Sequence, residues 1–204
     1  MSSTETPPNT GGSPSAASGS TRRAWTRIRS VGAVAVAVCL AVLVFVLRFN
    51  TLGGAFGGFD NDHFAQLIRA MEIRAGGLPL RDFADAEFRA WWPPLTYYAS
   101  AAAQAVFGAS LRSEAWLTVG AVAACVGVTV WLAARASESL LAAAVVGLLA
   151  AGLEPALYNY PKLLVATVML GAMAAYCRWP GRAALVGLAL ATVSAELWRH
   201  DHGA

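Results

Sequence analysis

Charged residues are scarce in this sequence of 204 residues, because Asp, Glu, Lys and Arg together make up only 13% of it. An ordinary soluble domain carries about 25%. The sequence also lacks a phosphate-binding P-loop, a glycine fingerprint for dinucleotides, a hydrolase nucleophile elbow and a zinc-protease helix. Its three cysteines, Cys39, Cys125 and Cys177, have no short spacing that would frame a zinc site or a disulfide scaffold. These absences argue against a large soluble enzyme.

Hydrophobic residues make up 57% of the sequence and gather into nearly uncharged blocks. Blocks of about 15 to 20 apolar residues are what a lipid bilayer selects. The sequence therefore predicts an all-α, polytopic transmembrane helix bundle. The five secure blocks are residues 31–47, 115–134, 139–157, 163–177 and 183–198.

A sixth apolar block, residues 93–107, leaves the number of spans open. A helix of that length rises about 22 Å, whereas the hydrocarbon layer is about 30 Å thick. If it is a hairpin or an interfacial helix, the chain has five spans, and the polar segments 60–92, 154–162 and 199–202 face one compartment. If it crosses, the first segment is separated from the other two. The loop that carries Arg178 and Arg182 resembles a cytoplasmic loop, which favours five spans.

The N-terminal 30 residues are predicted to be a disordered, basic cytoplasmic tail. Residues 1–21 are small or polar and have Glu5 as their single charge, so little apolar surface offsets the entropy of ordering. A cluster of arginines then precedes the first span, at Arg22, Arg23, Arg27 and Arg29. By the positive-inside rule this cluster is a topology signal, and not a nucleic-acid-binding patch. We therefore expect an inner-membrane, multi-pass module over residues 31–204 with a cytoplasmic N-terminus and an outer loop at residues 50–113.

The outer loop contains a predicted amphipathic helix. Its apolar residues have helical spacing, at Phe64, Leu67, Ile68 and Met71. Asp60 or Asn61 can cap its start, and Gly76, Gly77 and Pro79 can end it. An amphipathic helix this close to a span is expected to lie along the membrane surface.

Asp60 and Asp62 form the first cluster that could carry chemistry. Two carboxylates separated by one residue can share a divalent cation such as Mg or Mn, with Asn61 or His63 as a further ligand. Alternatively, one of them can act as a general base toward a hydroxyl group. On the pattern alone, a simple helix cap is the favoured interpretation.

Two further polar clusters follow apolar blocks. Tyr160 and Lys162 lie between two blocks, where a tyrosine suits the headgroup level and a lysine can meet a lipid phosphate. Arg199, His200 and Asp201 follow the last block, where arginine suits phosphate recognition. The simpler alternative for the first of these two clusters is an interfacial turn with a snorkelling lysine. The simpler alternative for the second is a group of charged residues that ends a membrane helix.

Five short segments, taken in order, resemble the polytopic glycosyltransferases of the GT-C superfamily. They are Gly-Phe-Asp-Asn-Asp-His-Phe at 58–64, Gly-Leu-Pro-Leu-Arg-Asp-Phe at 77–83, Pro-Pro-Leu-Thr-Tyr-Tyr at 93–98, Tyr-Asn-Tyr-Pro-Lys-Leu-Leu at 158–164 and Arg-His-Asp-His-Gly at 199–203. The most similar subgroup is the bacterial, family 39-like set related to protein O-mannosyltransferases and aminoarabinose transferases.

This resemblance implies transfer of a sugar from a polyprenyl-phosphate donor to an acceptor at the extracytoplasmic face. It implies that Asp60 or Asp62 is the base. The residues implied to bind the donor are Tyr160, Lys162, Arg199, His200 and Asp201. Enzymes of this group are usually longer, so a C-terminal portion or a partner subunit is expected to complete the module. The alternative is a non-catalytic or vestigial membrane subunit; a transporter ranks last, because the middles of the apolar blocks are nearly free of charge.

Overall fold

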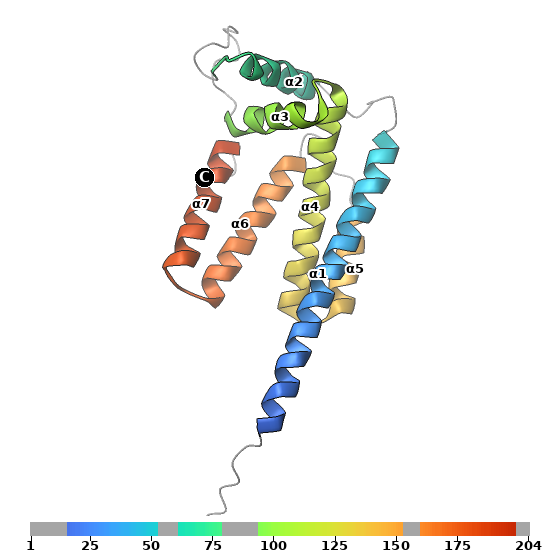
Figure 1. Cartoon of the computed structure of the whole chain (residues 1–204), viewed down its shortest axis with the longest axis vertical. Coiled ribbons are helices and arrows are strands. Elements are labelled where there is room, and N and C mark those ends of the chain that lie inside the picture. Colours follow the sequence, from blue (N-terminus) through green and yellow to red (C-terminus); the bar gives the residue numbers. More distant parts are fainter. Residues whose placement is uncertain (1–15, 53–60, 79–93, 153–159, 199–204) are drawn as a thin grey trace, which may run out of the picture.

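The computed structural model describes residues 16–52, 61–78, 94–152 and 160–198, and these residues form helices joined by short turns (Figure 1). No strand occurs within these ranges, which confirms the all-α prediction for them. The helices are α1 (Ala16–Leu52), α2 (Asn61–Arg74), α3 (Pro94–Phe107), α4 (Leu111–Ser137), α5 (Leu140–Gly152), α6 (Tyr160–Arg178) and α7 (Arg182–Trp198).

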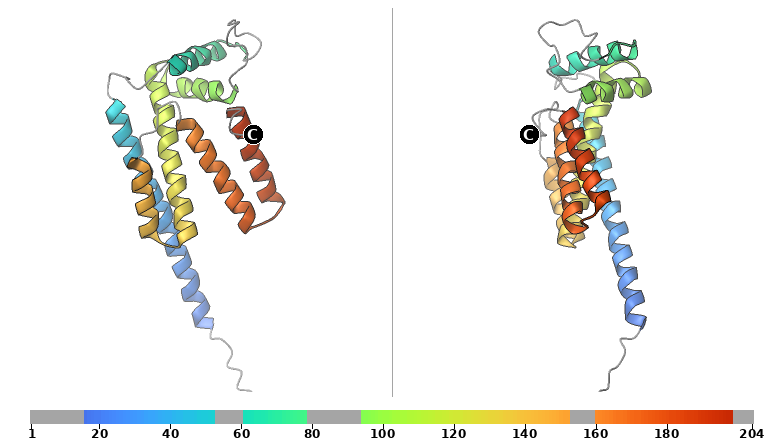
Figure 2. Two further views of the ribbon diagram at one scale, coloured as in Figure 1. Left: turned by 180° about the vertical axis from the view of Figure 1, so that it is seen from behind. Right: turned by 90° about the vertical axis from the view of Figure 1, so that its left-hand side faces the viewer.

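Five of these helices run alongside one another, and the other two lie across one end of the bundle they form. Figures 1 and 2 show α1, α4, α5, α6 and α7 extending along the long axis, with α2 and α3 across the tops of α4 and α7. We call this the α3 end. Helix α3, residues 94–107, packs across this end and not along the bundle, whereas the number of membrane spans stays a prediction.

The chain reaches and leaves the α3 end several times. Helices α1, α5 and α7 end there, at Leu52, Gly152 and Trp198, and helices α4 and α6 begin there, at Leu111 and Tyr160 (Figure 2). Two hydrogen bonds join helix ends at this level. Arg48 Nη2 donates to the carbonyl oxygen of Ala151 at 3.3 Å, and Thr96 Oγ1 donates to the carbonyl oxygen of Trp198 at 3.0 Å.

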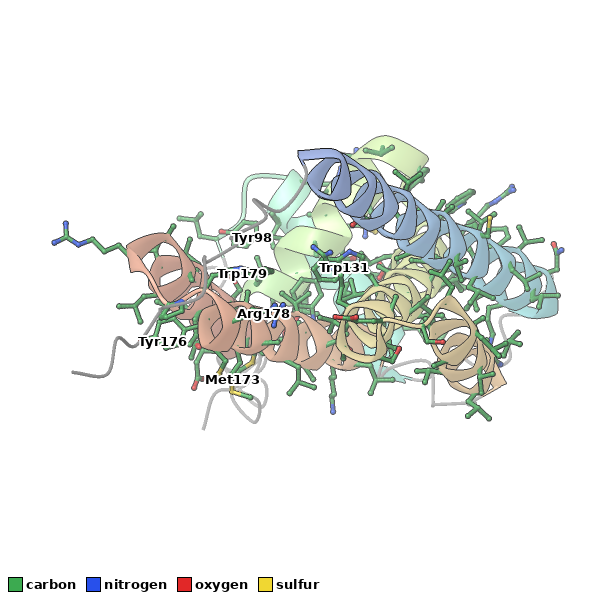
Figure 3. All side chains as sticks on the ribbon, turned by 90° about the horizontal axis from the view of Figure 1, so that it is seen from below. Tyr98, Trp131, Met173, Tyr176, Arg178 and Trp179 are labelled. Atoms are coloured by element: carbon green, nitrogen blue, oxygen red, sulfur yellow. The ribbon has the colours of Figure 1, made fainter. Side chains whose placement is uncertain are left out.

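Arginines and aromatic side chains mark the opposite end of the bundle. Arg135, in the last turn of α4, lies over the Trp131 ring at 5.7 Å, and Arg178 lies over the Trp179 ring at 5.9 Å. Figure 3 views the molecule from this end, with Trp131, Arg178 and Trp179 labelled. Both short turns, between α4 and α5 and between α6 and α7, lie here.

The best-packed core lies between α1, α4 and α5 and consists largely of small residues. Its buried members are Ala33, Ala37, Val44, Ala121, Val122, Val126, Val130, Ala134 and Ala143. Alanine at a helix contact lets the backbones approach closely, which increases dispersion contact along the whole length. Gly147 of α5 is the tightest point, because a Cβ atom there would overlap Cγ2 of Val130 and Cδ1 of Leu40.

The G147V substitution is therefore expected to lower the free energy of unfolding by about 2 kcal/mol, since overpacking moves Val130, a stiff β-branched residue. The matched control is G187V on α7, where a Cβ atom would meet nothing within 4 Å. Thermal unfolding in detergent, followed by circular dichroism, measures the difference. Equal melting temperatures for the two variants would contradict the predicted packing of α5.

Helix α2 forms where the apolar spacing predicted it and ends as predicted at the glycine pair. Gly77 N donates to Glu72 O at 2.9 Å and Gly76 N to Ile73 O at 3.0 Å, while Gly76 has φ of 95°. This is a Schellman motif, whose left-handed position favours glycine. The apolar side chains of α2 point outward: Phe64 is 44% exposed and Ile68 56%, whereas Arg69 is buried.

One helix boundary differs from that predicted. Helix α1 begins at Ala16, so residues 16–30 are helical although a disordered tail was predicted over residues 1–30. Once the apolar part of a helix is nucleated, each residue added to it costs little free energy, and the alanines and arginines of this segment are good helix formers. Residues 1–15 and residues 153–157, the last part of the predicted block 139–157, lie outside the described residues.

Within the described residues, two helices are long and apolar enough to cross a membrane: the segment Ser30–Asn50 of α1, and α4 (Leu111–Ser137). Helix α5 is a shorter apolar helix.

Candidate functional site

The three polar clusters predicted from the sequence adjoin helix ends that lie at the same end of the bundle, the α3 end. Asp62 is in the first turn of α2, Tyr160 and Lys162 are in the first turn of α6, and Arg199 follows the last residue of α7. Since α2 lies across this end and α6 and α7 meet it, the structure brings these helix ends to one side (Figures 1 and 2).

The side chains of this predicted site are only partly described. Asp60, Arg199, His200 and Asp201 lie outside the described residues. Asp62 and Tyr160 have described helical backbone without described side chains, and the side chain of Lys162 is half-buried. In the described part of the chain, no group of three or more His, Cys, Asp or Glu residues could hold a metal ion. The Asp60–Asp62 metal hypothesis therefore stays a prediction.

A buried polar cluster at the junction of α3 and α4 was missed by the sequence analysis. Ser100 and Gln104 of α3 are fully buried, and Glu114, in the first turn of α4, is 1% exposed. The Ser100 hydroxyl donates a hydrogen bond to Glu114 Oε1. Gln104 Nε2 donates to the carbonyl oxygen of Leu67 in α2 at 2.9 Å. This cluster ties α3 both to the bundle and to α2.

The ends of α3 and α4 that meet here are shaped by local sequence. Gly108 ends α3 with φ of 87°, and its N–H donates to the carbonyl oxygen of Gln104 at 2.9 Å, which is an αL cap. Ser110 has extended backbone at the N-cap of α4, and its carbonyl oxygen accepts from Ser113 Oγ at 2.6 Å. The tight turn leaves Glu114 facing α3.

An aromatic cluster packs beside this junction and joins α1 to α3 and α4. The Trp116 ring lies 4.9 Å from both Phe45 and Phe49 and is stacked on Phe107 at 5.1 Å. The guanidinium of Arg112 lies 5.9 Å from the centre of the Phe49 ring. Aromatic rings with a cation at this level are typical of a membrane–water interface.

The chain matches no protein-family model, no curated protein and no solved structure in the comparisons. The function is therefore inferred from the arrangement of these residues.

Proposed function

We propose that this protein crosses the cytoplasmic membrane five times and that its α3 end transfers a sugar from a polyprenyl-phosphate donor to an acceptor on the extracytoplasmic side. One observation supports this function most: the helix ends that adjoin Asp60 and Asp62, Tyr160 and Lys162, and Arg199 to Asp201 lie at the same end of the bundle. The groups that bind the donor phosphate and the base that deprotonates the acceptor hydroxyl must act at one reaction centre, so they need this common side.

The outer surface of the bundle supports a lipid environment. Large apolar side chains are exposed along α1, α5 and α7, for example Val31 at 69%, Leu141 at 76% and Leu190 at 62%. Contiguous apolar surface of this kind is unfavourable in water and suits hydrocarbon. Helix α6, with 19 residues, rises about 28 Å, close to the thickness of the hydrocarbon layer.

The charge distribution supports a cytoplasmic location for the end opposite α3. Arg135 and the Arg178–Arg182 turn lie there. The arginine-rich start of α1 extends beyond the bundle on the same side (Figure 1). Short loops rich in Lys and Arg stay in the cytoplasm.

In the proposed reaction, Asp60 or Asp62 accepts the proton of the acceptor hydroxyl as its oxygen attacks the anomeric carbon. The bond between that carbon and the phosphate oxygen breaks, and polyprenyl phosphate leaves with the bonding electrons. Lys162 and Arg199, with Tyr160, His200 and Asp201 around them, would stabilise the charge that develops on the phosphate. A Mg or Mn ion at Asp60 and Asp62 would supply further charge stabilisation when bound.

Binding of undecaprenyl phosphate tests the proposed donor site. In nanodiscs, the K162M variant is expected to bind this lipid about tenfold more weakly than the wild type, because it loses a charge-assisted contact to the phosphate. The matched control is R182M, which removes one positive charge at the opposite end. Equal losses in the two variants, or equal binding of the uncharged lipid undecaprenol by the wild type, would contradict a phosphate site at the α3 end.

A further inference from the structure

Three polar side chains of α3 lie one helical turn apart and each bonds to a different helix. Thr96, Ser100 and Gln104 are spaced by four residues, which places them on one face. Thr96 bonds to the Trp198 carbonyl oxygen in α7, Ser100 to Glu114 in α4, and Gln104 to the Leu67 carbonyl oxygen in α2. We call these three residues the polar stripe of α3.

Each of these bonds is directional, and the Ser100–Glu114 bond is fully buried whereas the other two are partly buried. All three side chains of the stripe are buried, with exposures of 4% for Thr96 and 0% for Ser100 and Gln104. A hydrogen bond in such surroundings is electrostatically stronger than one exposed to water. Trp198 is the last described residue of α7, so the bond from Thr96 ties the start of α3 to that part of α7.

Among the described helices, α3 packs on both α2 and α7. Helix α2 also packs on α4, and α7 also packs on α6. The separation between α2 and α7 therefore depends in part on how firmly α3 holds each of them. Five of the other eleven residues of α3 are alanines, which make no directional contact, so the polar stripe supplies directional bonds that fix the rotation of α3.

We propose that the polar stripe makes α3 a strut that sets the distance between the start of α2 and the end of α7. Thr96 and Gln104 are then positioning residues: they act on the reaction through the segments next to them, Asp60 to Asp62 on one side and Arg199 to Asp201 on the other. Their role in the reaction rests on the proposed function, whereas the strut itself does not.

Distances between spin labels at exposed positions of α2 and α7 test the strut. Labels are attached to cysteines at Ile68 and Val193, in a background in which Cys39 and Cys177 are replaced by alanine and Cys125 by serine. In T96V, the population of molecules outside the main peak of the distance distribution is expected to rise about fivefold. This is the change in an equilibrium that follows from the loss of one hydrogen bond of average net strength.

Two variants separate the hydrogen bond from a general loss of packing. T96S keeps the hydroxyl group and is expected to restore the wild-type distribution. T192V makes the same change on α7, where the hydroxyl group bonds to Leu188 O of its own helix, and is expected to leave the distribution unchanged. A second label pair at Met173 and Val186, between α6 and α7, reports whether the bundle itself is intact.

The outcomes distinguish the strut from the proposed function. A T96V distribution identical to that of T192V overturns the strut, whatever the activity. If T96V broadens the distribution and the wild type transfers no sugar, the strut stands and the proposed function fails. If the strut and the proposed function are both correct, T96V is expected to lower kcat with little change in the KM for the donor, because the charged groups that bind the donor phosphate are intact.

Discussion

The D60N and D62N variants are expected to differ sharply in the rate of sugar transfer. One of them should lose roughly 10²- to 10⁴-fold, the contribution of a positioned general base, and the other should lose much less. Asp62 lies in the first turn of α2 and Asp60 just before it. A single base takes the proton of the acceptor hydroxyl, so only one of these two carboxylates is expected to carry this role. Asparagine keeps the shape and the helix-capping ability but cannot take the proton.

Release of polyprenyl phosphate from a panel of polyprenyl-phosphate hexoses and pentoses measures this effect in proteoliposomes. The matched control is E72Q, which removes a carboxylate from the same helix. Glu72 is paired with Arg69 at 3.0 Å and lies ten residues along α2 from Asp62. Rates for D60N and D62N that both stay within the range of E72Q would exclude an aspartate base in this loop.

Local sequence patterns predicted most of the helices, because each pattern depends only on neighbouring residues. The apolar blocks at residues 115–134, 163–177 and 183–198 all lie within observed helices, α4, α6 and α7. The end of α2 before the Gly76–Gly77 pair could be predicted, since the left-handed conformation of Gly76 is a local property of the backbone. The start of α1 could not, because composition describes the average polarity of a segment and not its connection to a stable helix.

The arrangement of residues 93–107 was beyond what a local pattern can predict. Length and hydrophobicity are similar for a short span and for a helix lying across a bundle. What distinguishes α3 is that its polar residues meet partners far along the chain: Thr96 bonds to Trp198, which is 102 residues away. The spacing of Thr96, Ser100 and Gln104 by four residues is visible in the sequence. The role of these side chains can be inferred only from the residues on other helices to which they bond.

The predicted site was found through charges that stand next to apolar blocks, and this signal misses buried groups. Glu114 directly precedes the apolar block 115–134, and nothing in its local sequence distinguishes it from an exposed loop residue. In the structure it is covered by α3, and its partner Ser100 is 14 residues away on another helix. A buried acid can be recognised only when the packing around it is known, because the free-energy cost of burying a carboxyl group depends on its hydrogen-bond partners.

Replacing Glu114 by alanine is expected to lower the free energy of unfolding by about 3 kcal/mol. Part of this loss arises because the Ser100 hydroxyl stays buried without its hydrogen-bond acceptor. The other part arises from the cavity that the missing side chain leaves. E114Q fills the same space and offers an oxygen to Ser100, so its loss is expected to be about 1 kcal/mol. Thermal unfolding in detergent, with the α2–α7 label distance as a second signal, measures both variants.

A double-mutant cycle with S100A tests whether this cost arises from the pair. In S100A/E114A neither partner is left unsatisfied, so the double variant is expected to be more stable than the sum of the two single losses by about 1 kcal/mol or more. Thr118 provides a matched control, because its hydroxyl group bonds to the Glu114 backbone carbonyl and not to the carboxylate. T118V should therefore add its loss to that of E114A without coupling. Strict additivity of S100A and E114A would show that Glu114 stabilises the junction by filling space alone, and α3 would then be held at this point by packing and not by its polar stripe.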